Sequence, residues 1–290
     1  MNKRGTSHFM SGITKFLKRL FGRRIVIFGT VLVVLFVMTA LLAPYISPHN
    51  PYKQNLALSF AKPSAEHILG NDELGRDILS RLIYGTRTSL SIGFIAVMIA
   101  AGCGIILGLV AGYVGGVVNS VISRVMDALL SIPAIMLSLG LGIIFGSGMA
   151  SLMVILGLST IPTYTRLMCA QVLAIRNSDY INAERVLGAG SIRIMFSHIL
   201  PNCLSPIIVL FTMNIGGTIL AEASLSFLGL GVKAPMASWG AMVNEGYSRL
   251  ITNPVFALAP GVCIMLLVLG FNILGDGLRD ILDPRLRGSI

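Results

Sequence analysis

Charged residues are scarce in this sequence: Asp, Glu, Lys and Arg make up only 12% of its 290 residues, about half the share found in a typical globular domain. Hydrophobic residues make up 54%. This composition excludes an intrinsically disordered chain and is more apolar than one water-soluble core requires. It indicates an all-α polytopic membrane protein.

The residue patterns of common enzyme and metal sites are also missing. The four cysteines lie far apart with no CxxC spacing, which argues against a disulfide scaffold or a cysteine-based metal site. There is no HExxH motif, and all four histidines lie outside the apolar runs. No Lys follows a Gly, so a GxxxxGK[ST] phosphate loop is impossible. We therefore expect no catalytic residue, metal site or cofactor in this chain, and ATP energy would have to come from a partner.

The formal net charge of +10 reflects topology rather than a nucleic-acid surface. Seven of the 22 Lys and Arg residues precede residue 25, and the others lie between apolar runs. Positive charge at the ends of apolar runs is typical of contact with anionic lipid headgroups. We expect membrane lipid, and no nucleic acid, as a partner.

Six apolar segments are long enough to cross a bilayer, which takes roughly 20 residues. The first is interpreted as a retained anchor, because the apolar region of a cleaved signal peptide, the rival interpretation, is usually shorter. The long uncharged run 128–165 fits two spans, with a turn at Gly146-Ser147-Gly148. The predicted spans are 25–43, 90–113, two within 128–165, 203–228 and 255–274.

The distribution of Lys and Arg predicts the orientation. The segments on one side of the six spans hold 15 of these residues, and the alternate segments hold 7. The richer side is expected to be cytoplasmic, which places both termini in the cytoplasm and suggests the bacterial inner membrane. The predicted organisation is a basic cytoplasmic tail (1–24), an anchor helix (25–43), an extracytoplasmic segment (44–87), a core of five spans (88–275) containing the cytoplasmic loop 176–201, and a cytoplasmic tail (276–290).

Small residues recur at every fourth position of the second span. They are Ala96, Ala100, Gly104, Gly108, Gly112 and Gly116. This spacing lets helix backbones approach closely, which matters in lipid because no hydrophobic force drives apolar helices together. The stripe is interpreted as packing within the bundle, or alternatively as contact with a second subunit around a substrate path.

Glu222 is the only charged residue within the six spans. Its distance from Cys203, about 28 Å along a helix, places it near the outer surface. A proton relay, which usually needs ionisable groups near the bilayer centre, is therefore not expected. Glu222 either hydrogen-bonds to a loop, Ser224 or Ser226, or lines the outer mouth of a pathway.

The segment between the fourth and fifth spans predicts a compact helix-turn-helix. Ala183, Val186 and Leu187 share one face of its first helix, and Gly188 allows a sharp bend. Pro201 suits the first turn of the next spanning helix, where its missing N–H costs nothing. Such an element, joined rigidly to a spanning helix, can transmit a push.

This segment resembles the EAA loop of binding-protein-dependent ABC importer permeases, with the pattern E-A-A-x3-G and then I-x-L-P. Here the triplet is Asn182-Ala183-Glu184, followed by Gly188 and by His198-x-Leu200-Pro201. Four further blocks are similar to the dipeptide/oligopeptide/nickel permease group. They are Gly70-Asn71-Asp72-Glu73-Leu74-Gly75-Arg76-Asp77, the run from Glu222 to Gly231, Ser238-Trp239-Gly240 with Glu245-Gly246, and Gly275-Asp276-Gly277-Leu278-Arg279-Asp280 with Asp283-Pro284-Arg285.

The resemblance implies a type I ABC importer permease fold and a set of partners. These are a second homologous permease subunit, two ABC ATPase subunits that carry ATP and Mg, and an extracytoplasmic solute-binding protein. The implied ATPase-coupling residues are Asn182, Ala183, Glu184, Arg185, Gly188, Ala189 and Pro201. The extracytoplasmic or pathway candidates are Asp72, Arg76, Asp77, Glu222, Trp239 and Glu245.

The resemblance also implies the function, which is import of dipeptides or oligopeptides by alternating access. Nickel, glutathione or another small solute are alternatives within the same group. A passive channel is an alternative of another class, and it would conduct solute without ATP or partners. For Asp72, Arg76 and Asp77, capping and pairing at a helix start is an equally good interpretation, and Trp239 also fits an interfacial anchor.

Overall fold

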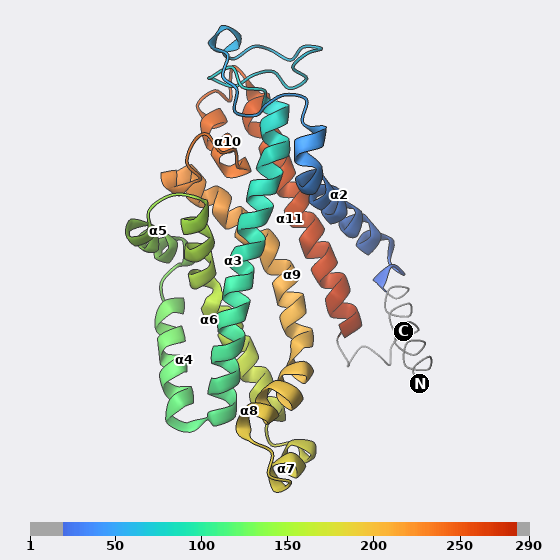
Figure 1. Cartoon of the computed structure of the whole chain (residues 1–290), viewed down its shortest axis with the longest axis vertical. Helices are drawn as coiled ribbons and strands as arrows, with labels where there is room; N and C mark the ends of the chain where they lie inside the picture. The colour runs from blue at the N-terminus through green and yellow to red at the C-terminus, as the bar shows by residue number, and fades with distance from the viewer. Residues whose placement is uncertain (1–19, 283–290) are drawn as a thin grey trace.

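The computed structural model describes residues 20–282 as a bundle of long helices (Figure 1). Apart from an isolated bridge between Asn71 and Asp77, this part of the chain contains no β-structure. Most of the basic tail 1–24 and the block Asp283-Pro284-Arg285 lie outside the described residues. The elements are α2 (Arg24–Ile46), η1 (Leu56–Leu58), α3 (Ile78–Val114), α4 (Gly116–Leu130), α5 (Ala134–Phe145), α6 (Met149–Ile175), α7 (Asp179–Val186), α8 (Ser191–Arg193), η2 (Ile194–Ile199), α9 (Leu200–Leu225), η3 (Ser226–Leu230), α10 (Trp239–Tyr247) and α11 (Pro254–Leu282).

Within residues 20–282, five helical runs are long and apolar enough to cross a membrane. They are α2, α3, α6, the run Ser191–Leu230 that contains α9, and α11. A sixth span requires α4 and α5 together, and these two helices meet at an angle of 95°.

The predicted third span is therefore not one straight helix that starts at Ala128. Pro133 follows the break and has no backbone N–H to continue a helix, so α4 ends at Leu130 and a new helix starts after the proline. The predicted turn at Gly146-Ser147-Gly148 is confirmed, since it separates α5 from α6.

α3 starts earlier than its apolar run suggests. Its first residue is Ile78, because the Asp77 side chain accepts a hydrogen bond from the Ser80 N–H and caps the helix. The first turns of α3 thus carry charged residues and extend beyond the predicted span 90–113. α11 likewise continues past residue 274, to Leu282.

α3 runs through the middle of the bundle (Figure 1). It packs against α6, α9 and α2, while α11 packs against α2 and α9. α7 lies at one end of the bundle, and α10 with the loop before α3 lies at the other. We refer to these as the α7 end and the α10 end.

The stripe of small residues on α3 faces α6 of the same chain. A Cβ added at Gly104 would lie 2.4 Å from the Tyr164 Cβ, and one added at Gly108 would lie 2.5 Å from the Thr165 carbonyl oxygen. No real Cβ makes such contacts, so the two backbones touch only because these residues are glycines. Gly104, Gly108 and Gly112 thus pack within the bundle, as the first interpretation predicts, whereas Gly116 starts α4 and has open space around it.

The helix that leads from α8 into α9 contains a wide π-helical stretch, Ile194–Ile199. It lies directly before Pro201, whose ring cannot donate a hydrogen bond and would clash with the carbonyl four residues earlier in a regular α-helix. The wider turn accommodates the proline without ending the helix. The cytoplasmic loop predicted from the sequence is thus continuous with α9.

Gly108→Ala should destabilise the protein by about 1–3 kcal/mol, because the new methyl group overpacks the contact between α3 and α6. The matched control is Gly102→Ala on the same helix, where a Cβ meets nothing within 4 Å. That change should be neutral or stabilising, since Ala is the better helix former by about 1 kcal/mol. Unfolding of both variants in detergent measures the difference, and equal stability would contradict the α3–α6 contact.

Candidate functional site

Helix α7 projects beyond the ends of the long helices (Figure 1). It ends in a Schellman motif, in which the Ala189 N–H donates to the Glu184 carbonyl and the Gly188 N–H donates to the Arg185 carbonyl, both at 3.0 Å. Gly188 has φ +80°, a left-handed conformation that other residues adopt only with strain. The bend predicted at Gly188 is therefore confirmed, and it has a defined geometry.

Three contacts fix α7 to the spanning helices. Ile181, a residue of α7, is fully buried in the hydrophobic core. The Arg185 side chain donates to the Arg176 carbonyl at the end of α6, at 3.1 Å. The same guanidinium lies 5.6 Å from the centre of the Tyr113 ring on α3, within the range of a cation–π contact. These contacts link α7 to the neighbouring ends of α3 and α6.

Two residues that depart from the EAA pattern have partners within this segment. The Asn182 side chain accepts from Arg185 and donates to the Asn177 carbonyl, both at 3.1 Å. Glu184 lies 3.7 Å from the His198 ring on η2. The remaining predicted coupling residues lie on α7 (Ala183), in the turn after it (Gly188 and Ala189) and at the start of α9 (Pro201). Ala183, Gly188 and Pro201 are exposed, and Ala189 is partly buried against the core.

The tip of this element carries an exposed apolar surface. Val186, Leu187 and Ile192 are 87%, 82% and 72% exposed. Side chains of this size are rarely so exposed together unless another surface covers them. We call these three residues the α7 tip.

At the α10 end, a buried network of charges joins the loop before α3 to α3 and α10. The Asp72 carboxylate accepts from the Arg76 Nε at 2.6 Å and from the Arg81 Nη1 at 2.7 Å. Both arginines also donate to Glu245 on α10, at 3.3 Å and 3.0 Å. Asp72, Arg76 and Arg81 are at most 3% exposed, so each charge depends on its partners.

Glu245 lies at the outer edge of this network. Burial raises the pKa of its carboxyl to about 7, an effect that the guanidinium of Arg76 partly offsets. Its charge, unlike that of an ordinary glutamate, therefore changes near neutral pH.

Glu222 on α9 and Trp239 on α10 are also buried at the α10 end. Glu222 is fully buried and accepts hydrogen bonds from Ser226 at 2.8 Å, Ser238 at 3.0 Å and Ser89 at 3.3 Å. The expected bond to Ser226 is present, and Ser224 bonds instead to a backbone carbonyl.

Trp239 is fully buried rather than at a lipid interface. Its Nε1 donates to the Leu82 carbonyl at 3.0 Å, and its ring packs edge-on against Phe36 of α2 at 5.4 Å. Neither Trp239 nor Glu222 can touch a solute in this conformation.

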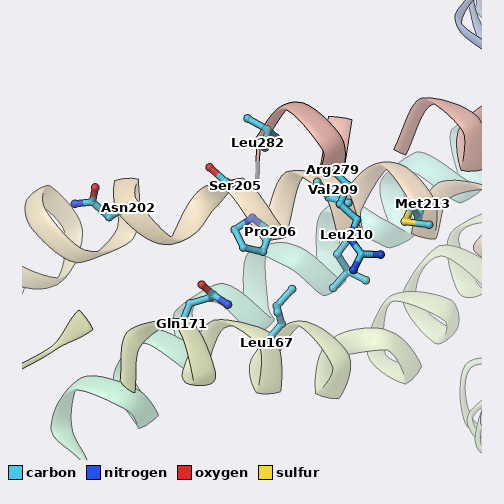
Figure 2. Close-up of a pocket in the computed structure, with 10 residues that line it drawn as sticks. All are labelled: Leu167, Gln171, Asn202, Ser205, Pro206, Val209, Leu210, Met213, Arg279 and Leu282. Carbon is cyan, nitrogen blue, oxygen red and sulfur yellow. The ribbon is translucent and has the colours of Figure 1, made fainter. Parts of the chain in front are cut away.

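A cavity of about 480 Å³ opens between α6, α9 and α11 in the half of the bundle nearer α7. Figure 2 shows Gln171 and Leu167 of α6 facing Pro206 of α9 across it. Its lining is mostly apolar. The residues are Leu167, Gln171, Asn202, Ser205, Pro206, Val209, Leu210, Met213, Arg279 and Leu282. None of the predicted pathway residues lies in this cavity.

The sequence pattern missed Arg81, Ser89 and Ser238. Arg81 is the second guanidinium on Asp72. It belongs to none of the quoted sequence blocks, and Arg87 separates it from the uncharged run that starts at residue 88. The two serines bind Glu222 from α3 and from the residue before α10. No sequence spacing relates them to Glu222, since the contacts form only in the folded bundle.

Residues 104–288 match the binding-protein-dependent transport system inner membrane component family, and the chain belongs to this family. Residues 13–63 match the N-terminal TM domain of oligopeptide transport permease C.

Relatives cover almost the whole chain. It is 40% identical to the dipeptide transport system permease protein DppC of Alkalihalophilus pseudofirmus, over 93% of this chain and 89% of that protein. It is 42% identical to the glutathione transport system permease protein GsiD of Pectobacterium atrosepticum, over 94% and 91%. Among solved structures, the inward-facing MetNI methionine ABC transporter has a TM-score of 0.59 at 19% identity, over 70% of this chain and 97% of that chain. The expected ABC permease fold is confirmed.

Asp72→Asn should destabilise the protein by about 3–5 kcal/mol, because it removes the buried carboxylate and leaves two buried guanidinium groups to share the partly exposed Glu245. The control is Asp127→Asn, which breaks the pair with Arg166 where both side chains are largely exposed. That change should cost less than about 1 kcal/mol. Thermal unfolding in detergent compares them, and similar losses would show that the Asp72 network is not a structural anchor.

Proposed function

We propose that this chain is one of two permease subunits of an ATP-driven importer that moves peptides across the bacterial inner membrane by alternating access. The family supports the transport role, and the relatives named for dipeptide transport support the solute class. The observation that carries the coupling role is the α7 tip, whose three apolar side chains are exposed at the end of α7 and on α8.

In this proposal the α7 tip docks on an ATPase subunit. Burial of Val186, Leu187 and Ile192 would supply the driving force, while Gly188 and Arg185 hold the geometry. When ATP binding closes the ATPase pair, α7 moves with its ATPase and carries the ends of α3 and α6. The spans then tilt to face outward, and hydrolysis resets them.

The other partners follow from surfaces that this chain leaves incomplete. A second homologous permease subunit would complete the path, because the cavity between α6, α9 and α11 is open on one side. A solute-binding protein would dock at the α10 end. ATP and Mg would be held by the two ATPase subunits, and this chain would carry no catalytic group or cofactor. The α7 end and both termini would then be cytoplasmic, as the Lys and Arg distribution predicts.

Leu187→Asp should abolish co-purification of the ATPases with the permease. A buried apolar contact of this size is worth about 2 kcal/mol, so the association should weaken more than about tenfold. Ile251→Asp is the matched control, since Ile251 is 99% exposed at the α10 end. Pull-down from membranes that co-express all subunits measures the recovery, and equal recovery for both variants would remove the coupling assignment.

A change in the backbone conformation just after α7 tests the coupling assignment independently. Gly188→Val forces a β-branched residue into the left-handed region, at a cost of about 1–3 kcal/mol, and should also reduce recovery. Gly190→Val is its control, because Gly190 has φ −65° and open space around it. Ala183→Asp places a charge on the same element and should act like Leu187→Asp, while all variants remain inserted in the membrane.

A strain that lacks this chain should lose uptake of labelled dipeptide, and the wild-type chain should restore it. The relative named for glutathione transport makes glutathione the second candidate, so a competition assay with unlabelled glutathione separates the two. Stronger competition by glutathione than by dipeptides would reassign the solute. In liposomes the chain alone should conduct neither solute, and flux without partners or ATP would favour the passive channel.

A further inference from the structure

The loop at the α10 end brings together two histidines and a glutamate. One ligand atom from each of His49, Glu66 and His67 lies within 4.8 Å of the other two. The rings of His49 and His67 have centroids 4.6 Å apart. These residues lie apart from the α7 tip and from the cavity, and the transport mechanism does not use them.

A single chain of hydrogen bonds orients the two histidines. His67 Nδ1 lies 2.9 Å from the Asp77 carboxylate, which also accepts from the Ser80 hydroxyl at 2.7 Å. The Ser80 hydroxyl accepts in turn from the backbone N–H of His49 at 3.0 Å. The ring of His67 and the backbone of His49 are thus both held by the residues that cap α3.

The carboxylate of Asp77 settles the tautomer of His67. An ionised carboxylate only accepts hydrogen bonds, so the proton of His67 is on Nδ1 and the lone pair is on Nε2. A histidine whose far nitrogen donates to a carboxylate is the usual arrangement of a metal ligand, because the carboxylate orients the ring and makes it more basic. The His67 side chain is only 12% exposed, which limits competition from water.

His49 supplies the second nitrogen. Its Nδ1 is buried and has no hydrogen-bond partner among the described residues. Buried polar atoms are rarely left without a partner, and a bound cation would provide one. Glu66 is exposed, so a change of side-chain rotamer could bring its carboxylate closer to the two imidazoles than it lies in this structure.

We propose that His49, Glu66 and His67 bind one divalent transition-metal ion of the zinc class, with Asp77 as the positioning residue behind His67. Two imidazoles and one carboxylate suit zinc and its neighbours, whereas calcium and magnesium prefer oxygen ligands. Water would complete the coordination shell. The ion would clamp the start of the loop, just after α2, to the stretch that precedes α3.

Zinc titration of the full permease complex tests this proposal. The complex is purified through a tag without histidine, stripped with a chelator and titrated with Zn²⁺ alone, using calorimetry and metal analysis by mass spectrometry. The wild-type permease should bind one equivalent. Glu66→Gln and His67→Gln should each weaken binding at least about tenfold, as loss of a ligand does.

Two variants serve as controls. Glu73→Gln removes an exposed carboxylate of the same loop, and His198→Gln removes a histidine at the α7 end; neither should change the affinity. Equal zinc binding by Glu66→Gln, His67→Gln and wild type would overturn the proposal, as would the absence of any saturable binding.

Cobalt substitution provides a measurement that does not depend on any variant. Co²⁺ bound to the wild-type complex should give the visible absorption of a four- or five-coordinate nitrogen and oxygen site, and Zn²⁺ should displace it while Ca²⁺ should not. Displacement by Ca²⁺ at equal concentration, or an octahedral spectrum typical of aqueous cobalt, would contradict the assigned ligands.

Discussion

The backbone contact between α3 and α6 is the constraint on which the rest of the structure depends. Lipid offers no hydrophobic force that would hold two apolar helices together. The attraction must therefore come from close packing along the length of the two helices. The stripe that includes Gly104, Gly108 and Gly112 allows that contact along about two turns of α3. Larger residues on this face would separate the helices and remove that close contact.

Because α3 is continuous from Ile78 to Val114, it connects the two ends of the molecule. At the α10 end it carries Arg81, which binds Asp72 and Glu245. At the α7 end its Tyr113 ring supports Arg185, and Arg176 donates to the Gly112 carbonyl at 2.9 Å. One helix of roughly 55 Å therefore joins the proposed ATPase contact to the charged network at the other end.

The apolar runs predicted most of the helices, because hydrophobic length is a local property of the chain. α2, α6, α9 and α11 all lie where the uncharged stretches indicated, and Gly188 marked the bend after α7. The break between α4 and α5 was missed, since an uninterrupted apolar run gives no sign of a 95° bend except Pro133.

The partners within the sites could not be predicted from spacing. Glu245 is 164 residues from Arg81, and Ser89 is 133 residues from Glu222, so only packing of α3 against α9 and α10 brings them together. The same holds for His49 and His67, which form no known ligand motif. Trp239 was a pathway candidate, with an interfacial anchor as the alternative, and neither fits the structure, because the ring is fully buried.

The π-helical stretch before Pro201 also sets the direction in which α7 points. Along the merged helix the buried side chains as far as Ile207 are Ile194, Met195, Ile199, Cys203 and Ile207. A π-helical turn holds one residue more than the α-helical hydrogen-bond pattern, and loss of that residue would turn everything upstream by about 100° around the helix axis. The direction of the α7 tip therefore depends on the number of residues in this stretch and not only on which side chains it carries.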